Sequence, residues 1–147
     1  MTPAELTEFI HRSIPLTRAL AARVTEAGAR RLCIEAPLEP NLNPHGTAFG
    51  GSLATLGILA GWLVLHHELV EADLDVGLVV RHSELDYLRP VTGTLIADSA
   101  LADADWQDFA ATLRAGRRAR ITVVSRLRSG ADDAVRVRAD YVATPQR

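Results

Sequence analysis

The sequence contains no lysine, because all sixteen of its basic residues are arginine. Its one cysteine, Cys33, has no partner for an internal disulfide, which excludes a disulfide-stapled scaffold. The formal net charge is only −2, so the chain lacks the basic surface that binds nucleic acid or an anionic membrane. The N-terminus also lacks a basic start followed by an apolar run and a cleavage site. These absences predict a cytoplasmic protein without a nucleic-acid or membrane partner.

The length of 147 residues predicts one domain over residues 1–147, and 48% hydrophobic residues suit a globular core. The run from Ala48 to Leu65 holds no charged residue over eighteen positions, close to the lower limit for a membrane-spanning helix. We instead predict a buried core helix, because the rest of the chain forms half-apolar strands that need an apolar cover. The small residues Ala54, Gly57 and Gly61 in this run either leave a pocket beside the helix or let strands pack closely against it.

Hydrophobic periodicity predicts three helices, over residues 3–13, 52–70 and 105–115. It predicts six strands, over residues 19–25, 31–36, 76–87, 94–101, 120–128 and 135–141. Thr2 with Glu5 is expected to cap the first helix and Asp105 the third, and hairpin turns are expected at residues 27–28 and 129–130. An apolar helix beside five or six half-buried strands is best buried when the strands wrap around it, which predicts an α+β fold. Cys33 is expected to be inert, on the more polar face of its strand.

The segment that most indicates chemistry is Asn41-Leu-Asn-Pro-His-Gly-Thr-Ala-Phe-Gly-Gly-Ser52. In it, Gly50 and Gly51 stand where an irregular loop enters the long helix. The first backbone N–H groups of a helix have no partner within it and lie at the positive end of its dipole. Such groups bind an anion or a developing oxyanion. The alternative is that the glycines only allow the chain to turn.

This loop and helix, together with Glu84-Leu-Asp-Tyr-Leu-Arg-Pro-Val91, resemble the hotdog superfamily of acyl-CoA thioesterases. The sequence is most similar there to the family typified by the C-terminal domain of YiiD. The shared features run through most of the chain. They include the Asn-x-Asn loop, Gly-Thr-x-Phe-Gly-Gly-Ser, the helix with Trp62, the Tyr-Leu-Arg-Pro strand end and the last strand ending in Tyr141-Val142.

The resemblance implies a hotdog fold, in which a curved antiparallel sheet wraps around the central helix. It implies a homodimer with the two sheets joined edge to edge, or a tetramer of such dimers, with active sites shared between subunits. The substrate would be a small-molecule acyl thioester with coenzyme A as part of it, so no separate cofactor is expected. The backbone N–H of Gly51 or Ser52 would hold the thioester carbonyl, and Asn43 matches a family asparagine that lines the site.

The sequence departs from the family pattern at three positions. Phe49 stands where many small hotdog thioesterases have the histidine of His-Gly-Gly, Ile58 stands at their usual carboxylate, and Val80 stands at a serine that faces the site. To replace the carboxylate, we considered the strand over residues 76–87, on which strict alternation places Val80, His82, Glu84 and Asp86 on one face. His82, from the facing subunit, is therefore the predicted base, and His45 is the second candidate.

Substrate contacts are expected from Thr47, Phe49, Gly50 and Arg89, where Arg89, with Arg117 and Arg118, would meet the phosphates of coenzyme A. No pair of His or Cys has metal-ligand spacing, so no metal is predicted. The predicted function is hydrolysis of an acyl thioester by water. The missing helix carboxylate leaves open a domain that binds acyl thioesters without turnover. A hotdog hydratase or dehydratase is a further alternative, although His45 has no acidic neighbour in the sequence.

Overall fold

The computed structural model describes residues 1–146. Its helices are α1 (Pro3–Ser13), α2 (Leu16–Ala19), the 3-10 turn η1 (Glu39–Asn41), α3 (Gly50–Glu71) and α4 (Asp103–Arg114). Its strands are β1 (Arg23–Gly28), β2 (Arg31–Ala36), β3 (Val76–Tyr87), β4 (Leu95–Ala100), β5 (Ala119–Ser129) and β6 (Asp132–Pro145).

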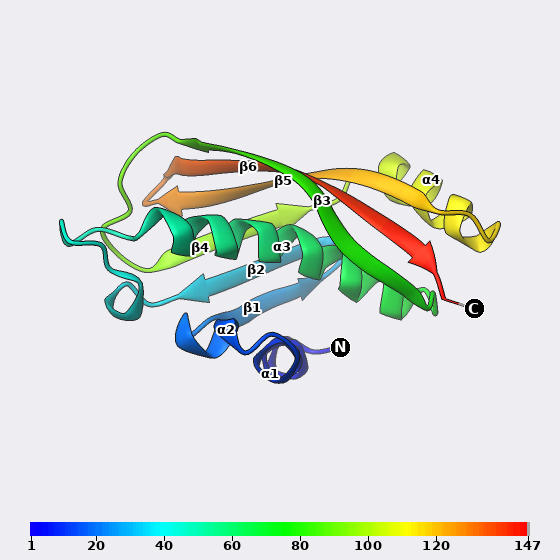
Figure 1. The fold of residues 1–147 in the computed structure, drawn as a ribbon, viewed down its shortest axis with the longest axis horizontal. Coiled ribbons are helices and arrows are strands. Elements are labelled where there is room, and N and C mark those ends of the chain that lie inside the picture. The colour runs from blue at the N-terminus through cyan, green and yellow to red at the C-terminus, as the bar shows by residue number, and fades with distance from the viewer. Residues whose placement is uncertain (147) are drawn as a thin grey trace.

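The strands form one antiparallel sheet in the order β1-β2-β4-β5-β6-β3, and the sheet curls around α3 (Figure 1). Helix α1 packs beside β1 at one edge of the sheet, and β3 forms the other edge. Between these two edges one side of α3 is left without a strand over it (Figure 1). The predicted α+β fold, with a curved sheet wrapped around a long central helix, is confirmed.

Helix α3 is apolar on almost all sides, and the curled sheet surrounds most of it, which buries these apolar sides. Leucines 53, 56, 59, 63, 65 and 69 are buried, and 61% of its most apolar eighteen-residue window is buried, so the predicted core helix is confirmed. The glycines face the sheet at close range. A Cβ at Gly57 would lie 2.5 Å from Val137 Cγ2, and one at Gly61 would overlap the Tyr141 hydroxyl. Gly57 and Gly61 therefore allow close strand packing and leave no pocket on that side.

Local sequence signals located most element ends, with a few errors. The capping box of Thr2 and Glu5 is present at α1. The first hairpin turns at Ala29 and Arg30, which both have positive φ, and not at residues 27–28. Its first strand begins at Arg23 because α2 ends at Ala19 and a turn with positive φ at Ala21 follows it. Helix α4 begins before Asp105, which therefore cannot be its N-cap.

Strand β3 contains a bulge that changes which side chains face α3. Val80 pairs with the buried Tyr141, but His82 pairs with the next residue of β6, Asp140, so Arg81 has no partner of its own. The extra residue reverses the alternation. Beyond it, Ser83, Leu85 and Tyr87 pair with the buried Ala139, Val137 and Val135, whereas His82, Glu84 and Asp86 point to the outer face. The prediction that Val80 and His82 share a face is therefore wrong.

His66 lies in a stack of parallel rings at the open side of α3. Its ring centroid lies 4.5 Å from that of Phe9 and 4.9 Å from that of Trp62. Burial, with a smaller contribution from His67, lowers the pKa of His66 below its usual value. In the unfolded chain this histidine binds a proton near pH 6.5 and below, whereas in the folded protein a lower pH is needed to protonate it. The free energy of unfolding should therefore fall as the pH drops from 7 towards 5.

Urea unfolding at pH 7, 6 and 5 tests this expectation. His66→Phe keeps an aromatic ring in the stack but cannot bind a proton, so its free energy of unfolding should depend less steeply on pH than that of the wild type. His45→Gln, on an exposed loop, is the matched histidine control. An equal slope in His66→Phe and the wild type would contradict the assignment.

Candidate active site

The loop that enters α3 is held in place by Asn41. This residue is buried, and its side-chain amide donates to the carbonyl oxygens of Leu20 (3.0 Å) and Pro37 (2.8 Å). Its own main-chain carbonyl accepts the N–H of Phe49 at 2.7 Å, and the N–H of Ala48 donates to Val91 O at 2.8 Å. The first residue of the Asn-x-Asn pattern is thus an anchor of the helix entrance, a role that the sequence analysis missed.

Asn43 and Thr47 close the tip of the same loop. The Asn43 amide donates to the Thr47 hydroxyl (2.6 Å) and to Ala48 O (3.3 Å), and its oxygen accepts the N–H groups of His45 and Thr47. These bonds commit both hydrogens and the oxygen of the Asn43 side chain to the loop itself. The structure therefore places Asn43 and Thr47 as residues that shape the loop, and His45 at its exposed tip.

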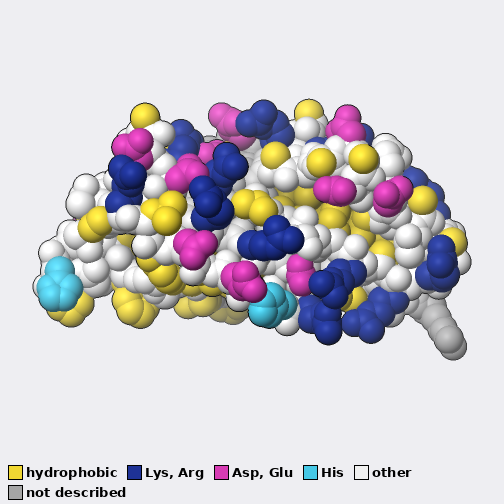
Figure 2. All heavy atoms as spheres, turned by 90° about the horizontal axis from the view of Figure 1, so that it is seen from above, with side chains coloured by type: hydrophobic (Ala, Val, Ile, Leu, Met, Phe, Trp, Pro, Cys, Tyr) yellow, Lys and Arg dark blue, Asp and Glu magenta, His cyan; other side chains and the backbone are white. Residues whose placement is uncertain are grey.

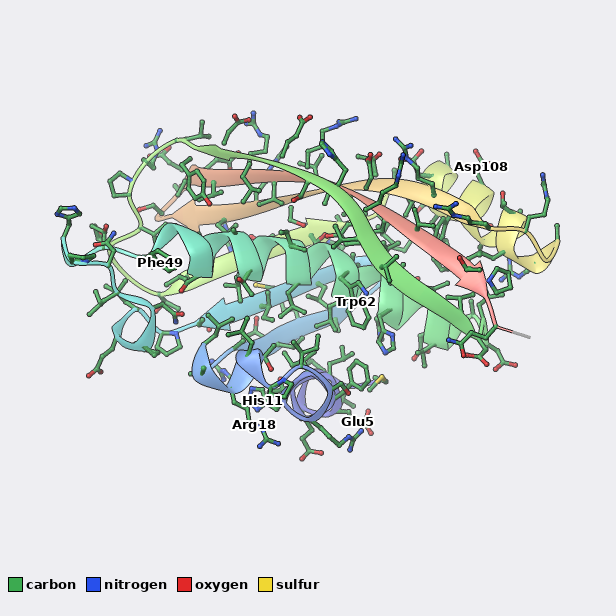
Figure 3. The ribbon with its side chains drawn as sticks, viewed as in Figure 1. Glu5, His11, Arg18, Phe49, Trp62 and Asp108 are labelled. Carbon is green, nitrogen blue, oxygen red and sulfur yellow. The ribbon has the colours of Figure 1, made fainter. Side chains whose placement is uncertain are left out.

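The N-terminus of α3 presents unpaired amide groups. The N-cap residue is Phe49, which supplies no side-chain acceptor, and the N–H of Leu53 makes the first helical bond, to Phe49 O. The N–H groups of Gly50, Gly51 and Ser52 are thus the orphan donors of this helix end, where the helix dipole is positive. The Phe49 ring lies against Gly51, with Cζ 2.9 Å from where a Gly51 Cβ would stand. It lies beside the start of α3 (Figure 3).

Tyr87, the last residue of β3, reaches the same helix end. Its hydroxyl donates to Gly50 O at 3.0 Å, and its ring lies against Gly50. Strict alternation along the strand places Tyr87 on the face opposite His82 and so does not predict it at the site. A signal was present, since the apolar Leu85 and the aromatic Tyr87 alternate with Glu84 and Asp86.

An apolar cleft of about 300 Å³ lies along α3 next to β3. We call it the α3–β3 cleft. Its lining residues are Ile14, Thr55, Ile58, Leu59, Trp62 and Val80. Trp62 Nε1 donates to the carbonyl of Leu78 on β3 at 2.9 Å, and Trp62 extends from α3 on the side of α1 (Figure 3). The hydroxyl of Thr55 donates to Gly51 O at 2.8 Å, so a polar group lies where the cleft approaches the helix end.

The structure does not bring His82 to this site. His82 lies on the outer face of the sheet, where Nε2 is 3.2 Å from Glu84 Oε1 and where Asp140 is its partner in register. Figure 2 shows that face as a mixture of arginine and acidic side chains. Within one chain, the geometry therefore separates His82 from the amides of α3 and from the α3–β3 cleft.

Two other residues occupy defined positions outside the cleft. Arg89 forms an exposed ion pair with Asp132 (2.9 Å), two residues beyond Tyr87. Cys33 is buried despite facing away from α3, and burial raises the pKa of its thiol to about 11. Within residues 1–146, no cluster of three or more His, Cys, Asp or Glu side chains could hold a metal ion.

A curled six-stranded antiparallel sheet around one long helix, with free amides at the start of that helix, defines a hotdog-fold protein of the thioesterase type. The family model described as "Putative thioesterase (yiiD_Cterm)" matches residues 3–145, and the chain belongs to this family. The family supports thioester hydrolysis as the class of reaction.

Solved structures agree with this fold. The chain is similar to a structure described as a "putative thioesterase" from Shewanella oneidensis, with 25% identity, coverage of 97% of both chains and a TM-score of 0.89. It shares its fold with a Chlorobaculum tepidum protein described as having unknown function, with 24% identity, 99% and 98% coverage and a TM-score of 0.91. A "probable thioesterase" from Pseudomonas aeruginosa shares the fold at 16% identity, with 98% and 97% coverage and a TM-score of 0.73.

Proposed function

We propose that the protein hydrolyses acyl-CoA thioesters by direct attack of water at the N-terminus of α3. The observation that carries the proposal is that the orphan amides of Gly50, Gly51 and Ser52 lie about one helical turn from Thr55, which lines the apolar α3–β3 cleft and donates to Gly51 O. An acyl thioester has the two matching parts, a carbonyl oxygen that becomes an anion during attack and an apolar chain. Preorganised donors at the oxyanion usually contribute the largest share of catalysis in acyl transfer.

In the proposed reaction the protein supplies mainly the amide donors for the oxyanion and the cleft for the acyl chain. The water oxygen forms a bond to the thioester carbon, and the carbonyl electron pair moves to the oxygen, where the Gly51 and Ser52 amides hold it. The carbonyl then reforms and the C–S bond breaks. A thiol has a pKa near 8.5, so the thiolate leaves without prior protonation. The proton released by the water passes to solvent or to the departing thiolate.

Thr55 is the residue that we propose orients the attacking water. It is the one lining residue of the α3–β3 cleft with a polar side-chain group apart from the Trp62 indole. Because its hydroxyl hydrogen is donated to Gly51 O, the oxygen keeps its lone pairs for a water molecule. In this proposal Asn43 supports the site indirectly, through its hydrogen bonds within the loop. Ile58 contacts the acyl chain, and His82 takes no part in the reaction.

The open edge of the sheet favours a second copy of the chain as partner. Strand β3 has twelve residues and pairs on one side only, with β6. It exposes Val79 by 60% and Val80 by 43% at this edge. A long edge strand with unpaired main-chain groups readily pairs with another chain. In the homodimer that we propose, each cleft is completed by the partner, and Arg89 exchanges Asp132 for a phosphate of coenzyme A.

Binding without turnover is the second candidate function. The family resemblance places Ile58 at the usual carboxylate position, and the residues that line the α3–β3 cleft include neither a carboxylate nor a histidine. A domain that holds the thioester carbonyl at the amides without activating water would have this composition.

A thioesterase assay across acyl-CoA and acyl-carrier-protein substrates of increasing chain length tests both candidates. Thr55→Val keeps the shape of the side chain and removes the hydroxyl, so kcat should fall about tenfold, which corresponds to about 1.4 kcal/mol. His82→Ala is the control and should retain wild-type turnover. Acyl-CoA binding without turnover on any substrate would favour the binding domain, and a loss of activity in His82→Ala would contradict our proposal.

A further inference from the structure

We infer that Tyr87 is a positioning residue of the oxyanion site, which acts by polarising and orienting the peptide group between Gly50 and Gly51. The inference rests on the proposed function, because it concerns how well the Gly51 amide stabilises the oxyanion. Tyr87 does not itself touch the reacting atoms.

The carbonyl of Gly50 and the N–H of Gly51 belong to one planar, conjugated peptide unit. The Tyr87 hydroxyl donates to the carbonyl end of this unit at 3.0 Å. The N–H end is one of the orphan donors of α3. A hydrogen bond at one end of a conjugated amide therefore acts directly on the donor at the other end.

The fold holds Tyr87 at this place from a rigid element. The bulge at Arg81 turns Tyr87 to the helix side of β3, where it pairs with the buried Val135. Immediately after it, the N–H groups of Leu88 and Arg89 both donate to Ala134 O, at 2.7 and 3.2 Å. The ring also lies against Gly50, with Cε1 3.5 Å from the position of a Gly50 Cβ. Bulges near active sites commonly aim a side chain in this way.

The effect of the bond is cooperative. A hydrogen bond accepted by the carbonyl draws electron density from the N–H and strengthens it as a donor by about 10–30%. One oxyanion donor contributes on the order of 100- to 1,000-fold to kcat. Tyr87→Phe keeps the ring against Gly50 and removes only the hydroxyl. We expect kcat to fall about two- to eightfold while KM stays within about twofold, because the ground-state carbonyl carries little charge.

Tyr141, the second of the two tyrosines, provides a matched control. Its hydroxyl also donates to a main-chain carbonyl of α3, that of Ile58, at 2.6 Å. The peptide that it contacts lies two turns further along the helix, and the ring is fully buried in the core. Tyr141→Phe therefore removes the same kind of bond from a peptide that does not face the oxyanion. It should lower the free energy of unfolding and leave kcat unchanged.

The experiment combines steady-state kinetics with the backbone amide resonances of both variants. In Tyr87→Phe, the amide 15N and 1H resonances of Gly51 should move and kcat should fall. In Tyr141→Phe, the resonances of Leu59 should move and those of Gly51 should stay. If the wild type is active, either an unchanged kcat or an unmoved Gly51 resonance in Tyr87→Phe would overturn the inference. A rise in KM that accounts for the whole loss would also overturn it, since Tyr87 would then bind substrate directly.

The two proposals fail in different ways. A wild-type protein that hydrolyses no thioester in the assay would refute the proposed function, and the role of Tyr87 in catalysis would fall with it. A wild-type protein that turns over thioesters at the same rate as Tyr87→Phe would refute only the inference about Tyr87.

Discussion

Gly51→Pro should lower kcat/KM for thioester hydrolysis by about 100-fold or more, the loss of roughly 3 kcal/mol that follows removal of one oxyanion donor. Proline has no backbone N–H, so the variant deletes the donor without adding a functional group. Gly51 is the second residue of α3, and proline is tolerated in the first turn because no helical bond uses that N–H. Steady-state kinetics on the best acyl-CoA substrate measure the effect.

Gly51→Ala is the matched control because it keeps the N–H. Its Cβ would meet the Phe49 ring, but this ring is 54% exposed and has room to turn away. The alanine variant should therefore lose far less activity than the proline variant. Thermal unfolding of both checks that the helix start is intact. If the two folded variants lost activity equally, the Gly51 amide would not be the oxyanion donor.

Gly61→Ala should lower the free energy of unfolding by about 2 kcal/mol, within the range for overpacking a core. A Cβ there would overlap the Tyr141 hydroxyl and lie 3.0 Å from its Cζ. Tyr141 cannot move aside easily, since its ring is fully buried and its hydroxyl bonds to Ile58 O. The gain of about 1 kcal/mol from the better helix propensity of alanine offsets only part of the cost. Urea denaturation measures the difference.

Two further variants give this prediction a sharp control. In a Tyr141→Phe background the nearest clashing atom is gone, so Gly61→Ala should cost clearly less than in the wild type. Gly93→Ala adds the same methyl group where no atom lies within 4 Å of the Cβ, and it should be close to neutral. Additive effects of Gly61→Ala and Tyr141→Phe would show that the two residues do not meet as the structure has them.

Much of the fold was predictable because the relevant signals are local. The start of α1 follows from Thr2, Pro3 and the capping-box Glu5, which are close together in sequence. The core position of α3 follows from an apolar run that has no charge to place in water. The buried faces of β5 and β6 follow from clean alternation, because both strands have neighbours on either side.

The candidate site was predictable only in part. The Gly50-Gly51 pair at the helix entrance was recognisable, since the orphan amides of a helix end depend on the main chain alone. The roles of Asn41 and Tyr87 were not, because each depends on segments distant in sequence. Asn41 reaches Leu20, and Tyr87 reaches Gly50, through contacts that no local pattern encodes.

By itself the sequence determined α1, α3 and α4, most strand bounds and the amide-bearing entrance to α3, because each depends on near neighbours and on the burial of apolar side chains. The tertiary structure decided which side of β3 meets the helix. One extra residue at Arg81 shifts the register against β6, moving His82 to the outer face and Tyr87 to the site. The order of residues along a strand is the same whether or not one of them forms a bulge, so the sequence pattern does not show which face the later side chains take. Pairing with β6 is what fixes the bulge, and with it the side chains that surround the candidate site.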